Sequence, residues 1–114
     1  MNANMTVAVT GGTGFTGAAV IKRLLADGYH VRALARSASG IEPSDKLEVV
    51  VGDLGNPEAL ARLVHGVDTV FHIAAMYRSE GSLEEFLSVN YEGTRSLLEV
   101  SRQTCVRRFI YCST

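Results

Sequence analysis

The sequence of 114 residues has little of what marks several protein classes: two cysteines, two prolines and no tryptophan. Two cysteines are too few for a disulfide framework, and Cys105 and Cys112 have neither the spacing nor the partner residues of a zinc site. We therefore expect no metal site and expect both thiols to be reduced and structural. Cys112 lies within an apolar segment and is predicted to be in the core.

Charge of one sign and long apolar runs are also missing. Eleven basic and twelve acidic residues leave a formal net charge of -1, which removes a general electrostatic case for binding nucleic acid or an anionic membrane. No apolar run approaches the roughly 20 residues that span a bilayer. The first five residues lack the basic and apolar regions of a signal peptide. The sequence predicts a cytoplasmic protein with no nucleic-acid or membrane partner.

What the sequence does contain is a regular alternation of apolar strands and amphipathic helices. Apolar residues make up 46% and charged residues 20% of the chain, as expected for one globular domain over residues 1–114. Most of the predicted strands are apolar on both faces, which is typical of a parallel sheet covered on both sides. Right-handed crossovers favour a Rossmann-type doubly wound α/β fold with strand order 3-2-1-4-5. The predicted strands are 5–9, 30–35, 47–51, 68–74 and 106–112, and the predicted helices are 18–26, 58–64 and 83–103.

A glycine-rich stretch, residues 10–17, joins the first predicted strand to the first predicted helix. Gly12, Gly14 and Gly17 fit the spacing G-x-G-x-x-G, in which glycines permit a tight turn, backbone approach to a pyrophosphate, and close packing of helix on strand. The helix then directs unpaired N–H groups and its positive end at the phosphates. A turn that only joins the two elements is the alternative. The context favours a dinucleotide site at Gly11, Gly12, Thr13, Gly14, Phe15, Thr16 and Gly17.

The residues after the second predicted strand indicate which dinucleotide is bound. An acidic residue there would hold the ribose 2′-hydroxyl of NAD, but the sequence has Arg36 followed by Ser37, with no carboxylate between Asp27 and Glu42. A guanidinium can bind a 2′-phosphate through two hydrogen bonds. The sequence therefore predicts NADP(H) in preference to NAD(H). The alternative is a solvated loop arginine.

Five segments together resemble the extended short-chain dehydrogenase/reductase superfamily, which includes nucleotide-sugar epimerases, dehydratases and dihydroflavonol-type reductases. They are T-G-x-x-G-x-x-G at 10–17, Gly-Asp-Leu at 52–54, His-Ile-Ala-Ala at 72–75, Val-Asn-Tyr-Glu-Gly-Thr at 89–94 and Arg-Phe-Ile-Tyr-Cys-Ser-Thr at 108–114.

The resemblance implies that Asp53 and Leu54 lie at the adenine. It also implies that Ile73, Ala74 and Ala75 line the adenosine-ribose side, and that Asn90 supports the site. Each has a plainer interpretation, since Asp53 can cap its turn, the alanines can be packing residues and Asn90 can be a surface helix residue.

The superfamily's chemistry uses a Tyr-x-x-x-Lys pair with a nearby serine or threonine. The tyrosine is the acid/base, the lysine holds the nicotinamide ribose, and the hydroxyl orients the substrate oxygen. None of the four tyrosines here has a lysine four residues later. Thr114 aligns with the catalytic hydroxyl residue, and Ser113 is the adjacent candidate. We expect no hydride chemistry from these 114 residues alone.

Two explanations account for the missing pair. The chain is either the cofactor-binding part of a longer NADP(H)-dependent epimerase, dehydratase or reductase acting on a small-molecule hydroxyl or carbonyl, or a non-catalytic NADP(H)-binding sensor. We favour the first, because the chain stops where the family's active site begins. Nucleotide sugars are the commonest substrates that the resemblance implies, with flavonol-like or steroid-like ketones as rivals. The last strand would be an apolar sheet edge, so we expect the isolated chain to form a homo-oligomer or to aggregate.

Overall fold

The computed structural model describes residues 5–37, 40–73, 82–84 and 91–112. Its strands form one five-stranded parallel sheet in the order β3-β2-β1-β4-β5. This confirms the predicted α/β class and strand order. The strands are β1 (Thr6–Thr10), β2 (His30–Ala35), β3 (Leu47–Val51), β4 (Thr69–His72) and β5 (Arg108–Tyr111), and the helices are α1 (Phe15–Ala26), α2 (Pro57–Val64) and α4 (Gly93–Gln103).

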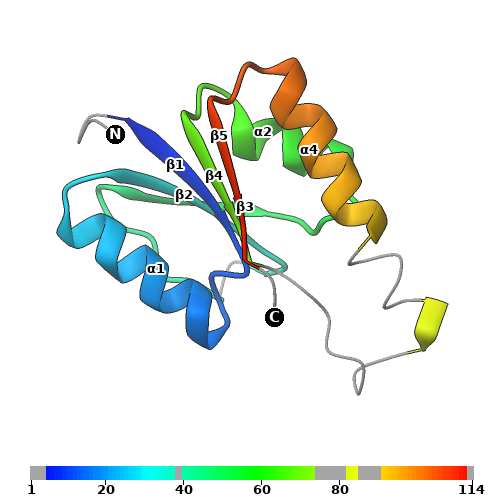
Figure 1. The fold of residues 1–114 in the computed structure, drawn as a ribbon. Coiled ribbons are helices and arrows are strands. Elements are labelled where there is room, and N and C mark those ends of the chain that lie inside the picture. The colour runs from blue at the N-terminus through cyan, green and yellow to red at the C-terminus, as the bar shows by residue number, and fades with distance from the viewer. Residues whose placement is uncertain (1–4, 38–39, 74–81, 85–90, 113–114) are drawn as a thin grey trace.

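The helices lie in two layers, one on each face of the sheet. Figure 1 shows α1 on one face and both α2 and α4 on the other. Side chains of β1 alternate between the two cores: Val7 and Val9 pack with Ile21 and Leu24 of α1, whereas Ala8 packs in the core that contains α2 and α4. Burial on both faces explains why the strands lack a polar alternation.

The helix ends carry residues that are typical of helix caps. Asn56 caps α2 by accepting a hydrogen bond from the Ala59 amide (3.1 Å), and Pro57 occupies the first turn, where no N–H is needed. Gly28 has φ 90° directly after the end of α1, a left-handed conformation that glycine adopts at little cost. The predicted helix over 83–103 includes α4, but residues 85–90 of that prediction lie outside the described residues.

The fifth strand corrects one prediction. Cys112 is only half-buried, not in the core, and Cys105 is exposed just after α4. Within the described residues β5 pairs only with β4, and Ile110 and Tyr111 are exposed. An apolar sequence at the margin of a sheet has neighbours on fewer sides than the same sequence at its centre.

Candidate functional site

The glycine-rich loop lies at the carboxyl end of β1 and leads directly into α1. Gly11 has φ 73°, and its carbonyl accepts a hydrogen bond from the Gly14 amide (3.1 Å). A Cβ on Gly17 would collide with the Gly11 carbonyl oxygen and lie 2.9 Å from the Gly12 Cα. Gly11 therefore makes the turn, although the G-x-G-x-x-G spacing begins at Gly12, and Gly17 allows the helix to approach the loop.

Several N–H groups of this loop and of the first turn of α1 are available to a ligand. Within the described part of the chain, the amides of the exposed residues Thr13, Phe15 and Thr16 have no hydrogen-bond partner, and neither has the amide of Gly12, which is a buried residue. Unpaired amides at the start of a helix, together with the helix dipole, favour an anion. The Gly14 amide is already used by the turn, so fewer amides face the ligand than the motif alone suggests.

Described residues on either side of positions 38 and 39, after β2, include two that contact this loop. Arg36 and Ser37 are exposed, and the Gly40 amide donates to the Ser37 carbonyl (3.2 Å). A Cβ on Gly40 would lie 2.9 Å from the Thr13 Cγ2, and a Cβ on Gly12 would lie 2.9 Å from the Ile41 Cδ1. These contacts place Gly40 and Ile41, which follow Arg36 in the chain, next to the loop.

The turn after β3 holds Asp53 and Leu54 in different environments. The Asp53 Oδ1 accepts a hydrogen bond from the Gly55 amide (2.8 Å), so this carboxylate does stabilise its own turn while remaining exposed. Leu54 is buried in the core, where a Cβ on Gly93 would lie 2.8 Å from the Leu54 Cβ. Among these two residues, the side chain of Asp53 is the one that solvent or a ligand can reach.

Ile73 follows β4 and is half-buried, and its amide donates to the Thr10 hydroxyl (3.0 Å). The remaining site residues predicted from the sequence lie outside the described residues: Ala74, Ala75, Asn90, Ser113 and Thr114.

Three hydrogen-bonded side chains, which the sequence did not single out, join β1, β4 and α4. The His72 Nδ1 lies 2.7 Å from the Thr10 Oγ1, and the Nε2 lies 2.7 Å from the Thr94 Oγ1. His72 and Thr10 are fully buried, and burial lowers the pKa of His72 from 6.5 to about 4. Its ring also packs against Phe109 and Tyr111. In the sequence, His72 stands out only as the first residue of the segment 72–75, and the one signal that could have suggested a close contact is the pair of small residues Gly93 and Thr94 at the start of α4.

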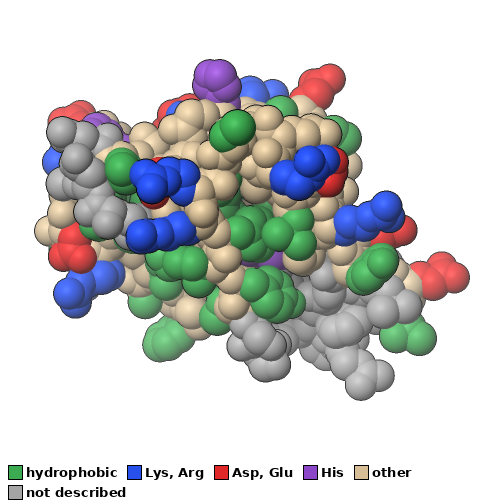
Figure 2. All heavy atoms as spheres, turned by 45° about the horizontal axis from the view of Figure 1, so that its top comes forward, with side chains coloured by type: hydrophobic (Ala, Val, Ile, Leu, Met, Phe, Trp, Pro, Cys, Tyr) green, Lys and Arg blue, Asp and Glu red, His purple; other side chains and the backbone are tan. Residues whose placement is uncertain are grey.

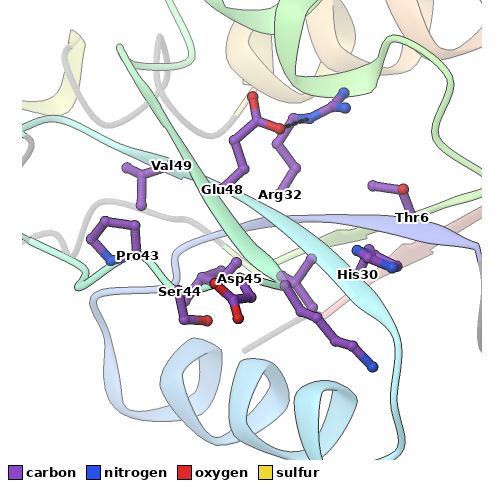
Figure 3. Close-up of a pocket in the computed structure, with 11 residues that line it drawn as sticks. Thr6, His30, Arg32, Pro43, Ser44, Asp45, Glu48 and Val49 are labelled. Atoms are coloured by element: carbon purple, nitrogen blue, oxygen red, sulfur yellow. Dashed lines mark hydrogen bonds and ion pairs between the residues drawn. The ribbon is translucent and has the colours of Figure 1, made fainter.

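A hollow of about 360 Å³ lies at the opposite, amino-terminal half of β2 and β3, with Thr6, His30 and Pro43 among its lining residues. Figure 3 shows Arg32 and Glu48 pointing toward one another in this region, with Nε and Oε1 3.3 Å apart. Arg32 also donates to carbonyls at the end of α2. Because these charges are occupied by protein groups, the hollow is a weaker candidate site than the loop.

The surface shows no concentration of one charge on the face drawn in Figure 2, where basic and acidic side chains are interspersed. Among the described residues, no group of three histidine, cysteine or acidic side chains could hold a metal ion. None of the helices in the described ranges has the length and apolar character needed to cross a bilayer.

Comparisons with known proteins agree with this geometry. A 3-beta-hydroxysteroid dehydrogenase of Mycolicibacterium neoaurum is 42% identical over 95% of this chain and 31% of its own length. A solved short-chain dehydrogenase/reductase superfamily protein from Agrobacterium tumefaciens, with bound NAD, is 35% identical, with a TM-score of 0.83 over 96% of this chain and 32% of its own. An epimerase structure from Methanothermobacter thermautotrophicus is 32% identical, with a TM-score of 0.88 over 97% of this chain and 35% of its own.

The chain thus spans about a third of the length of these relatives. The sequence model of one family matches residues 7–114, almost the whole chain. The chain belongs to the NAD dependent epimerase/dehydratase family.

Proposed function

We propose that these 114 residues form the NADP(H)-binding part of a reductase, dehydratase or epimerase that acts on a hydroxyl or carbonyl group. The observation that carries this proposal is the set of unpartnered loop amides, together with the exposed Arg36 a few residues before Gly40 and Ile41, which lie against the loop. The amides would bind the diphosphate and Arg36, with Ser37, the 2′-phosphate. The side chain of Asp53 would lie near the adenine. A solved relative of this chain contains bound NAD. The proposed preference for NADP(H) therefore rests on Arg36 and not on the comparison.

We also propose a class of substrate for the enzyme of which these residues would be a part. A hydroxysteroid dehydrogenase at 42% identity favours a secondary alcohol or ketone on an apolar carbon frame over the nucleotide sugars that the sequence resemblance put first. The dinucleotide supplies or accepts hydride when it is bound. These 114 residues contain no Tyr-x-x-x-Lys pair, so they are proposed to bind the dinucleotide without turning over substrate. Ser113 and Thr114 remain the candidates for the catalytic hydroxyl.

A fluorescence titration of the chain with NADPH and with NADH tests the cofactor assignment. We expect tighter binding of NADPH, and we expect Arg36→Ala to weaken NADPH binding about tenfold or more, as for loss of a hydrogen bond to a charged group. Arg36→Asp should reverse the preference, because a carboxylate repels the 2′-phosphate and accepts a ribose hydroxyl.

Arg95→Asp is the matched control. It makes the same change of charge at an exposed position on α4, outside the residues that we place at the dinucleotide. Equal losses of NADPH affinity in Arg36→Asp and Arg95→Asp would show a general charge effect and remove the assignment of Arg36. Binding of neither dinucleotide by the unmodified chain would overturn the proposed function.

A further inference from the structure

Two buried polar side chains and one half-buried one form a continuous bridge next to the glycine-rich loop. Thr10 is the last residue of β1, His72 the last of β4 and Thr94 the second of α4. Both links, from each hydroxyl oxygen to a ring nitrogen, measure 2.7 Å. The bridge therefore connects the strand that carries the glycine-rich loop to a helix of the opposite layer.

The Thr10 end of the bridge adjoins the loop. Thr10 directly precedes Gly11, whose left-handed backbone begins the turn. The Thr10 hydroxyl also accepts the Ile73 amide (3.0 Å), so this one oxygen joins the carboxyl ends of β1 and β4. The hydrogen bonds of the Thr10 hydroxyl therefore restrain the residue from which the Gly11 turn starts.

The Thr94 end is held in place by packing. The preceding residue, Gly93, is buried and lies against Leu54, close enough that a Cβ would meet the Leu54 side chain at 2.8 Å. The start of α4 is thus set against the turn after β3, while Thr94 reaches the ring of His72 at the end of β4. This contact fixes the position from which the Thr94 hydroxyl meets His72.

The ring makes the two hydroxyl groups depend on one another. A neutral imidazole has one donor and one acceptor nitrogen. If the Thr10 hydroxyl donates to Nδ1, then Nε2 must donate to Thr94; if Thr94 donates, then Nδ1 must donate to Thr10. The hydrogen bond at one end therefore selects the tautomer, and through it the hydrogen bond at the other end.

We propose that Thr94, acting through His72, is a positioning residue that holds Thr10 and the glycine-rich loop in the geometry that binds the dinucleotide. This inference rests on the proposed function. It requires a hydroxyl at position 94, and not merely a small side chain. Valine at this position keeps the shape of threonine but removes the hydroxyl, whereas serine keeps the hydroxyl.

The test compares Thr94→Val with Thr94→Ser in the full 114-residue chain. We expect Thr94→Val to raise the Kd for NADPH about threefold to tenfold, a range typical of coupling through a packed network, and Thr94→Ser to restore it. In the free chain, hydrogen exchange should accelerate at the Ile73 and Gly14 amides, which the Thr10 hydroxyl and the Gly11 carbonyl accept. The Val31 amide, bonded to Lys46 between strands, should keep its protection and serves as the internal control.

If Thr94 has only a structural role, Thr94→Val would accelerate hydrogen exchange at the Ile73, Gly14 and Val31 amides alike and leave the Kd of the folded fraction for NADPH unchanged. That result would overturn the proposal. So does a well-folded Thr94→Ser chain that fails to recover NADPH affinity. If the unmodified chain binds no dinucleotide, the proposed function fails, while selective exchange at Gly14 still reports whether the bridge positions the loop.

A measurement on the unmodified chain covers the case in which Thr94→Val does not fold. Nitrogen-15 NMR of the His72 ring should show one neutral tautomer in the free chain, with its ring signals moving when NADPH is added. A mixture of both tautomers that NADPH leaves unchanged would overturn the proposal, since the ring would then transmit nothing between Thr94 and Thr10.

Discussion

Gly17 and Gly14 belong to one motif but have different surroundings. Gly14 has φ −86°, which alanine adopts without strain, and its nearest contact for an added Cβ is 3.5 Å away. Gly17 is buried, and an added Cβ would meet the backbone of Gly11 and Gly12, which cannot move as a flexible side chain can. Of these two glycines, the fold therefore requires Gly17 and does not require Gly14.

We predict that Gly17→Ala lowers the free energy of unfolding by about 2 kcal/mol or more, because of overpacking against backbone. Gly14→Ala should change it by less than about 1 kcal/mol, yet weaken NADPH binding, since a methyl group would stand where a phosphate approaches. Urea unfolding of both variants, followed by NADPH titration, measures the contrast. Similar losses of stability at the two positions would contradict it.

His72 gives a prediction for pH dependence. Its pKa is about 4 in the folded chain, below its ordinary 6.5, because burial disfavours the charged ring. Between these values the unfolded chain binds more protons than the folded chain. The contribution of His72 to stability is therefore complete above about pH 6.5 and is lost as pH falls toward 4, by about 3 kcal/mol in all.

Urea unfolding at a series of pH values from 7.5 to 4.5 should show this decline. NMR of the ring should show that His72 remains uncharged at pH 5.5 in the folded chain. The same series with His65→Gln, at an exposed position, is the control and should keep the decline. A stability that is flat across this range would contradict the burial argument for His72.

At the scale of elements, Arg32 of β2 joins the sheet to the end of α2. Its Nη1 donates to the carbonyls of Arg62 (2.9 Å), Leu63 (3.2 Å) and His65 (2.7 Å). A cation at a helix C-terminus satisfies carbonyls that have no partner within the helix and interacts favourably with the helix dipole. The Arg32 side chain is 17% exposed, whereas its ion-pair partner Glu48 is 67% exposed.

We predict that Arg32→Met lowers the free energy of unfolding by about 2 kcal/mol, since three carbonyls lose a charged donor. Glu48→Gln should lower it by less than about 1 kcal/mol, because the ion pair is largely solvated. Thermal or urea unfolding of the two variants measures the difference. If Glu48→Gln were the more damaging change, the stabilising partner of Arg32 would be the carboxylate and not the end of α2.

At the scale of the whole molecule, the sheet ends in a strand with apolar side chains at its edge. Ile110 and Tyr111 of β5 are 42% and 52% exposed, and within the described residues β5 has a neighbour on one side only. An unprotected apolar edge pairs readily with another chain.

We predict that the 114-residue chain associates with itself as its concentration rises, and that Ile110→Lys suppresses this association. Light scattering over a wide range of concentrations measures it. Leu98→Lys, at another exposed apolar position but on α4, is the control and should leave association unchanged. A clean monomer at every concentration would contradict the role of the edge.

Local patterns in the sequence were enough to predict much of this architecture. Asn56 followed by Pro57 marks the start of α2, and the glycine-rich turn between β1 and α1 marks a parallel α/β sheet, because both signals act through neighbouring residues. The burial of Cys112 was predicted wrongly, since apolar character says nothing about whether a strand lies at the centre or the edge. The roles of Arg36 and Asp53 at the dinucleotide stay predictions.

The sequence by itself determined the fold class, the strand order and the place of the glycine-rich loop, because these depend on backbone conformation and on short-range apolar spacing. Only the tertiary structure decided which partners Arg32 and His72 find, since Thr10, His72 and Thr94 lie 62 and 22 positions apart in the chain. It also showed that Gly11 makes the turn and that Gly17 allows the close approach. Hydrogen bonds and steric contacts of this kind depend on distances across the sheet, which no local pattern contains.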